Sequence, residues 1–304
     1  MTDQERLRAL GERLRALGYS FVTVTPATHE RVLAREGSPT AAAAPLEKTL
    51  RDVFGWSKAF TAGALPPDLF ELLGPLAVRQ DELWKSTVRY SSLDGMLFAH
   101  SAFPTVESDA VFFGPDTYRF ASLLQARVET AGNAADVGCG SGAGGILLAQ
   151  RCKSMQLLDV NPRALQFASA NAALNGKTVR TAISDVLEKA EGPLDLVVAN
   201  PPYLADDLGR AYRDGGGALG TALSARICEE ALDRLQPGGR LLLYTATPVV
   251  DGRHVLWPAL EPRLRHARFD YRELDPDVFG EELLRNAYSD VERIAVVALD
   301  AFKL

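Results

Sequence analysis

The sequence predicts an α/β protein in which helices cover both faces of a mainly parallel, doubly wound sheet. Two observations carry this prediction: strand and helix patterns alternate after residue 132, and a glycine-rich loop follows the first of these strands. The preceding residues show helical periodicity and then an extended pattern. We therefore expect a mainly helical N-terminal substrate-recognition domain over 1–82, a β-hairpin linker over 83–102 and the α/β domain over 103–304.

The first helix is expected over residues 6–18, where the sequence Arg-Leu-Arg-Ala-Leu-Gly occurs twice. Gly18 can end this helix. Helical spacing places four leucines on one face: Leu7, Leu10, Leu14 and Leu17. Further helices are expected over 29–35, 46–54 and 67–73, and residues 37–45 are expected to be a loop.

The periodicity changes from helical to extended between Leu83 and Ala102. The turn signal Asp94-Gly95 predicts a hairpin, with strand residues on both sides of it: Trp84, Val88, Tyr90, Met96 and Phe98. Residues 103–118 are rich in aromatic and acidic side chains and are expected to form a covering loop that leads into a helix over 117–130.

Seven strands and four helices are expected in the remaining chain. The strands are predicted over 134–137, 155–159, 179–183, 194–199, 240–245, near Tyr271 and over 293–299. The helices are predicted over 144–151, 162–175, 221–235 and around 254–265, with a turn at Pro237-Gly238-Gly239. Ligands of such a sheet bind beyond the carboxyl ends of its strands.

The glycine-rich loop runs from Asp136 to Gly145 and is expected to bind a nucleotide-type cofactor. Glycines permit positive φ and close approach of a ligand to backbone N–H groups, and the following helix adds a partial positive field. Gly140, Gly142 and Gly145 also satisfy the dinucleotide fingerprint, with Asp159 at the position of a ribose-binding acid. Asp136, however, is poorly placed against a pyrophosphate and well placed to attract a cation.

Composition limits the other possibilities. The 304 residues carry a net charge of −6, and the N-terminus has no apolar signal segment, which favours a cytoplasmic protein without a membrane anchor. Three irregularly spaced cysteines predict neither a disulfide framework nor a zinc site. No basic face that would bind a polyanion is evident.

Asn200-Pro201-Pro202-Tyr203 follows the apolar run 196–199, at the end of the fourth strand. Together with the glycine loop, Asp159 and Ser184-Asp185, this motif resembles the class I S-adenosylmethionine-dependent methyltransferases that act on planar nitrogens. The resemblance covers about residues 103–250 and implies a Rossmann-like, seven-stranded sheet with S-adenosylmethionine as cofactor.

The resemblance also implies roles for individual residues. The methionine portion of the cofactor would contact Asp136, Gly138, Gly140 and Gly142, and Asp159 would bind the ribose. Ser184 and Asp185 would lie at the adenine, with Asp185 reaching its amine. Asn200 would be both a catalytic and a cofactor-site residue.

Methylation of a planar nitrogen requires its delocalised lone pair to be localised. The Asn200 side-chain oxygen and the Pro201 carbonyl can accept hydrogen bonds from the two N–H groups, and the prolines hold these acceptors in place. Tyr203 can stack on the acceptor group and fix the line of attack. We expect direct in-line transfer without a metal.

The architecture is most similar to the release-factor glutamine methyltransferases, whose Pro-Asp-Thr segment is matched by Pro115-Asp116-Thr117. The sequence departs from that family after Leu204, where a Glu-Pro pair is missing and Asp206-Asp207 stands instead.

Charge at the expected rim bears on the acceptor. Acids outnumber arginines in residues 91–120 and 201–220, and an acidic rim repels phosphate. The acids are Asp94, Glu107, Asp109, Asp116, Asp206, Asp207 and Asp214, against Arg119, Arg210 and Arg213. The expected acceptor is therefore an amide or guanidine nitrogen of a protein side chain, or of a small metabolite such as arginine. An exocyclic amine of an rRNA or DNA base, and a non-catalytic nucleotide-binding module, remain the alternatives.

Overall fold

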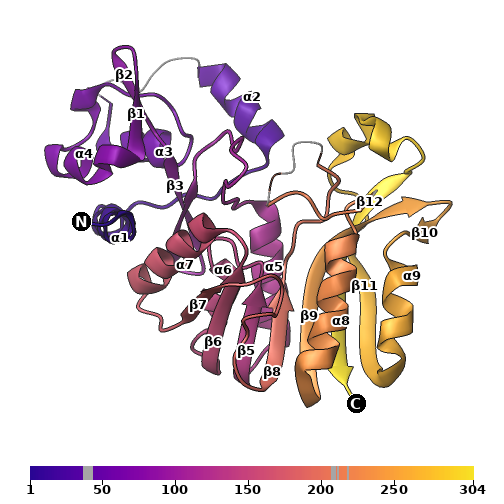
Figure 1. The fold of residues 1–304 in the computed structure, drawn as a ribbon. Helices are drawn as coiled ribbons and strands as arrows, with labels where there is room; N and C mark the ends of the chain where they lie inside the picture. Colours follow the sequence, from indigo (N-terminus) through magenta and orange to yellow (C-terminus); the bar gives the residue numbers. More distant parts are fainter. Residues whose placement is uncertain (37–43, 207–209, 211, 218) are drawn as a thin grey trace.

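The computed structural model describes residues 1–36, 44–206, 210, 212–217 and 219–304. The loop expected over 37–45 lies almost entirely outside these residues. Figure 1 shows one α/β unit with the N-terminal region above its sheet.

The central sheet confirms the predicted doubly wound architecture. Its strand order is β11-β12-β9-β8-β5-β6-β7, with a short β10 (Arg253–His254) beside β9. The pairs among β5 to β9 are parallel, whereas β12 runs antiparallel to both β9 and β11. The strands are β5 Ala131–Val137, β6 Cys152–Asp159, β7 Arg180–Ile183, β8 Leu194–Ala199, β9 Leu235–Val250, β11 Ala267–Asp275 and β12 Arg293–Lys303.

Alternating side chains of the strands form two apolar cores, one on each face of the sheet. On β8, Leu196 and Val198 join the core with α5, α6 and α7, whereas Val197 and Ala199 join the core with α8 and α9. The helices are α5 Pro115–Arg127, α6 Ala143–Leu148, α7 Pro162–Leu174, α8 Ala222–Arg234 and α9 Trp257–Leu260. The 3₁₀ turn η3 (Glu261–His266) follows α9, so the single helix expected around 254–265 is replaced by β10, α9 and η3.

Within its described residues, the N-terminal region contains four helices and two hairpins. The helices are α1 Asp3–Ala16, α2 Pro26–Glu36, α3 Leu46–Phe54 and α4 Pro67–Leu73, and the strands are β1 Ala77–Gln80, β2 Leu83–Ser86, β3 Val88–Leu93 and β4 Met96–Ser101. Two 3₁₀ turns, η1 (Ala62–Ala64) and η2 (Gly74–Leu76), flank α4. The leucine face of α1 is confirmed for Leu7, Leu10 and Leu14, which are buried, whereas Leu17 is the residue after the helix and is partly buried.

The strand expected over 84–90 is in fact two strands of different hairpins, because β2 pairs with β1 and β3 pairs with β4. The change of partner lies at Thr87, whose N–H donates to the Leu76 carbonyl beside β1 while its carbonyl accepts from the Ala102 N–H beside β4. The turn expected at Pro237-Gly238-Gly239 is a bulge within β9, marked by a register shift against β8 and by the positive φ of Gly238.

The N-terminal region does not pack as a separate core. Its buried leucines and aromatic residues share one apolar cluster with Phe167 and Leu174 of α7. Gly11 permits this contact, because a Cβ at residue 11 would lie 2.5 Å from a methyl group of Leu174. The boundaries at 82 and 102 stay a prediction, but α1 is held against the helix that follows β6.

Candidate active site

A cavity of about 440 Å³ lies at the carboxyl ends of the parallel strands. Its wall combines the glycine-rich loop after β5, the ends of β6 and β7, the Asn-Pro-Pro-Tyr segment after β8, and residues from 105 to 120. This is the position at which a doubly wound sheet binds its ligands. Pro26 of α2 also lines the cavity, so the N-terminal region contributes to its wall.

Asp136 is a buried acid at the end of β5, and its carboxylate accepts a 2.7 Å hydrogen bond from the Gly145 N–H. Burial, with a smaller contribution from the charge of Asp159, raises the pKa of Asp136 to about 7, even though the hydrogen bond from Gly145 opposes the shift. A cation placed in the cavity would favour the ionised form. This environment fits the predicted role of Asp136 toward a cationic ligand.

The glycines of the loop differ in what they do. Gly138 and Gly140 line the cavity with positive φ, and nothing lies within 4 Å of where a Cβ of Gly140 would stand. Gly142 also has positive φ, but it is not part of the cavity wall, and a Cβ there would press on Ile146 and Ala168. Gly142 therefore serves the packing of the loop, and its expected contact with a ligand stays a prediction.

Asp159 lies at the end of β6 and points to the same loop. Its two oxygens accept hydrogen bonds from the N–H groups of Gly140 (2.8 Å) and Asn161 (2.9 Å). Burial raises the pKa of this carboxyl group. Each carboxylate oxygen can accept more than one hydrogen bond, so Asp159, which lines the cavity, keeps the capacity that a ribose-binding acid requires.

Ser184 and Asp185 reach the cavity from the end of β7, but both side chains already have partners. The Ser184 hydroxyl donates to the Val186 carbonyl and accepts from the Lys189 N–H. The Asp185 carboxylate binds both terminal nitrogens of Arg226, each at 2.9 Å. Asp185 can still accept another hydrogen bond, but Arg226 fixes its orientation.

Asn200 is half-buried at the cavity wall, and across the described chain its side chain has no hydrogen-bond partner. Pro201 lies against the glycine loop, since a Cβ on Gly138 would be 4.0 Å from the Pro201 Cα. The amide oxygen proposed to activate an acceptor is thus available, next to the loop proposed to bind the cofactor.

Tyr203 lines the cavity but is 7% exposed, with its ring 6.0 Å from that of Phe279. Burial raises its pKa well above the ordinary value, and neighbouring Asp116 raises it further. Asp116 is itself buried and accepts hydrogen bonds from the Tyr244 hydroxyl at 3.0 Å and from Arg119 at 3.2 Å. Asp116, which also lines the cavity, therefore lies close to Tyr203.

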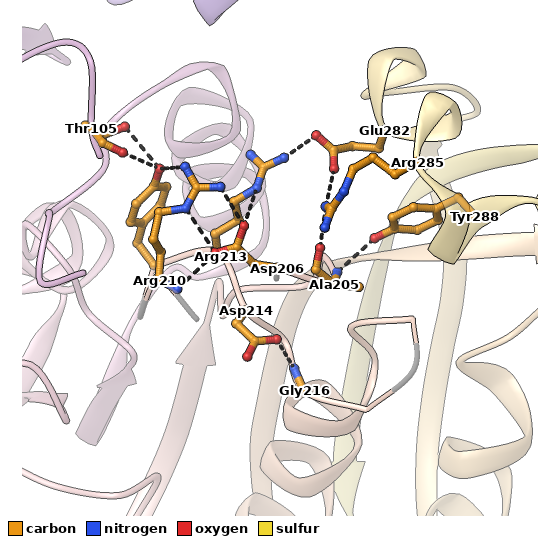
Figure 2. Close-up of polar contacts among 11 residues, drawn as sticks. Thr105, Ala205, Asp206, Arg210, Arg213, Asp214, Gly216, Glu282, Arg285 and Tyr288 are labelled. Carbon is orange, nitrogen blue, oxygen red and sulfur yellow. Dashed lines mark hydrogen bonds and ion pairs between the residues drawn. The ribbon is translucent and has the colours of Figure 1, made fainter. Parts of the chain in front are cut away.

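The segment after the motif closes one side of the cavity. Tyr212 stacks on Phe112 with centroids 5.6 Å apart, and its hydroxyl donates to the Thr105 carbonyl. Figure 2 shows the side chains of this segment extending between the loop at Thr105 and the C-terminal residues Glu282 and Arg285.

Some acids of the expected rim are paired with arginines. Asp109 pairs with Arg163, and the Asp206 side chain, which is 2% exposed, pairs with Arg210 and Arg213. Asp207 lies outside the described residues. Two further acids, Asp214 and Glu281, do line the cavity.

The residues that sequence analysis missed are Phe112, Tyr212, Phe279, Glu281 and Arg226. Phe279 and Glu281 stand between the last two strands, far along the chain from every motif, so no local pattern marks them. For Arg226, the only signal is its spacing to Glu230, with which it also pairs.

Residues 110–256 match the family model of the methyltransferase small domain, a range that holds the glycine loop, Asp159 and the Asn200 motif. The chain contains a class I S-adenosylmethionine-dependent methyltransferase domain. S-adenosylmethionine is the cofactor of this methyltransferase domain. The cavity fits it, because open backbone at Gly138 and Gly140 lies between buried carboxylates that suit a sulfonium and a ribose diol.

Relatives of the methyltransferase domain differ in their named substrates. A release factor glutamine methyltransferase of Deinococcus radiodurans is 35% identical over 48% of this chain and 54% of its own length. A ribosomal RNA small subunit methyltransferase C of Haemophilus ducreyi is 35% identical over 43% of this chain and 38% of its own. The chain spans about half the length of the release factor relatives it matches.

Among solved structures, Trm5b from Pyrococcus abyssi is similar with a TM-score of 0.51 and 17% identity, covering 74% of this chain and 62% of Trm5b. At this identity the likeness shows the shared fold alone. No helix in the described ranges is long and apolar enough to cross a bilayer. The described residues also contain no group of three His, Cys, Asp or Glu side chains arranged to hold a metal.

Proposed function

We propose that this chain transfers a methyl group from S-adenosylmethionine to a planar amide or guanidine nitrogen, with a glutamine side chain of a peptide chain release factor as the first acceptor to test. The observation that carries the proposal is the unpartnered Asn200 amide at the cavity wall, beside the glycine loop. The similarity of the methyltransferase domain to release factor glutamine methyltransferases supports the choice of acceptor.

The chain's own residues would prepare the nitrogen. The Asn200 side-chain oxygen and the Pro201 carbonyl accept hydrogen bonds from the two N–H groups of the acceptor, which moves electron density onto the nitrogen. Tyr203, which lies close to Asp116, limits the orientations of the planar group. The bound cofactor supplies a sulfonium methyl group, and the nitrogen becomes acidic on methylation, so its proton needs no strong base.

The test is Asn200→Ala in the full chain, assayed with labelled S-adenosylmethionine and a recombinant release factor. We expect S-adenosylhomocysteine affinity to change by less than about threefold and kcat to fall by roughly 100- to 1,000-fold, as for loss of a transition-state hydrogen bond. Asn133→Ala is the matched control, because that amide bonds the Pro193 carbonyl away from the cavity.

Loss of cofactor binding in Asn200→Ala would contradict the assigned role. Presenting rRNA or free arginine to the wild-type chain in parallel reactions distinguishes the acceptors. The rRNA relative makes base methylation the second candidate, and label entering rRNA but not protein would establish it in place of the amide. Binding of NADH in preference to S-adenosylhomocysteine would overturn the methyltransferase assignment altogether.

A further inference from the structure

The connection between β11 and β12 reaches the cavity from the C-terminal part of the chain. It contains two 3₁₀ turns, η4 (Gly280–Leu284) and η5 (Asn286–Tyr288), and contributes Phe279 and Glu281 to the cavity wall that also holds Asn200. Figure 1 shows this connection at the same end of the sheet as the N-terminal region. Activation of the acceptor by Asn200 and Pro201 does not by itself require this connection.

Phe279 adopts a backbone conformation that aromatic residues rarely take. Its φ of 58° and ψ of 40° are left-handed, a conformation that is strained for a non-glycine residue and persists only where the surroundings impose it. Two backbone hydrogen bonds of 2.8 Å fix the position, from Val278 N–H to the Ile294 carbonyl and from Glu282 N–H to the Phe279 carbonyl. The strained residue is the one whose ring faces Tyr203.

The connection is fastened to the segment that follows the catalytic motif. Ala205 donates its N–H to the Tyr288 hydroxyl at 2.8 Å, and its carbonyl accepts from Arg285. Arg213 pairs with Glu282, whose carboxylate also binds Arg285. Figure 2 shows these contacts bridging the two segments. Tyr203 and Phe279 are therefore held as one unit.

The two rings form a single bent aromatic surface, because their centroids lie 6.0 Å apart and their planes are tilted by 51°. Such a surface packs against the flat face of an amide or guanidine group. Glu281 and Asp214 line the cavity with it. Arg213 also lines the cavity, but its guanidinium is already paired with Asp206 and Glu282. These charges favour a neutral or cationic group over a phosphate-bearing one.

From this geometry we propose that Phe279 is an acceptor-binding residue. Its ring and that of Tyr203 contact the flat face of the acceptor while Asn200 engages the acceptor's N–H groups. The proposal rests on the proposed function and deepens it, since it names the aromatic surface that would hold the planar group of the acceptor.

The experiment compares Phe279→Gly, Phe279→Ala and Phe279→Tyr in the full chain, with a recombinant release factor as acceptor. Glycine adopts positive φ without strain, so Phe279→Gly removes the ring and keeps the backbone path. We expect both small variants to lose about 10- to 100-fold in kcat/KM, mainly through KM for the release factor, with S-adenosylhomocysteine affinity within about threefold of wild type. Phe279→Tyr should keep most of the wild-type kcat/KM.

Leu284→Ala is the control on the same connection, because Leu284 is 89% exposed and outside the cavity wall. A wild-type KM in Phe279→Gly would overturn the proposal, and so would an equal loss of cofactor affinity in both small variants, which would show a structural role. If a small variant fails to fold, Phe279→Tyr and Phe279→Leu decide instead: the aromatic variant must keep KM and the aliphatic one must raise it.

The two proposals fail differently. Absence of any methylation of the release factor by the wild-type chain counts against the proposed function, whatever Phe279 does. Methylation that depends on Asn200 but is indifferent to the ring at 279 leaves the proposed function standing and removes this inference.

Discussion

Replacing Asp136 with asparagine should stabilise the protein above neutral pH, although it alters a residue at the heart of the cavity. The carboxyl group has a pKa of about 7 in the folded protein against an ordinary value of 3.8, chiefly because it is buried. Asparagine cannot ionise, and its oxygen can keep the 2.7 Å hydrogen bond from Gly145. The substitution thus removes the cost of burying a charge.

The size of the effect follows from the shift. A folded pKa above the unfolded one gives stability that is complete below about pH 4 and is lost as the pH rises through 7. At about 1.36 kcal/mol per pKa unit, the folded wild-type chain bears a cost of at most about 4 kcal/mol at pH 8 and about 2 kcal/mol at pH 5. The Asp136→Asn variant would carry neither cost.

The assay is urea unfolding of the apo protein at pH 5 and pH 8, with Asp195→Asn as the control for removing one negative charge. Asp195 also accepts a 2.7 Å hydrogen bond from a backbone N–H, that of Asn133, but at an exposed position. We expect the gain of Asp136→Asn to be about 2–3 kcal/mol larger at pH 8 than at pH 5. Equal changes at the two pH values, or destabilisation at pH 8, would refute the reasoning.

Two further predictions concern the cofactor and the contact between the two halves of the molecule. Asp159→Ala should weaken S-adenosylhomocysteine binding by at least about tenfold, because a ribose contact contributes to cofactor binding, and should leave measurable turnover at saturating cofactor. Calorimetric titration and kcat measurements test this prediction, and an unchanged affinity would contradict it. Asn171→Ala should lower the free energy of unfolding by about 2–3 kcal/mol. The buried Asn171 amide forms hydrogen bonds with the N–H and carbonyl of Ala99 and with the Ser141 carbonyl. A loss below about 0.5 kcal/mol in urea unfolding would show that water replaces these bonds.

Local sequence patterns determined several short helices and strands, including their bounds. The helices over 46–54 and 67–73 and the strand over 194–199 were predicted with the bounds they have, because apolar spacing and flanking proline or glycine fix short elements locally. Glycines and acids at strand ends indicated the cofactor side of the cavity, since parallel strands bring their carboxyl ends together whatever the loops do.

Contacts between distant segments were decided only by the tertiary structure. The pairing of β2 with β1, the bulge in β9 and the clamp of Arg226 on Asp185 depend on partners that no local window contains. The same holds for the contact between Phe279 and Tyr203. It depends on the connection between β11 and β12, which is bound to the segment after Tyr203 through Glu282, Arg285 and Tyr288. The sequence therefore determined which residues meet at the glycine loop, whereas the packing of remote segments determined what else lines the cavity.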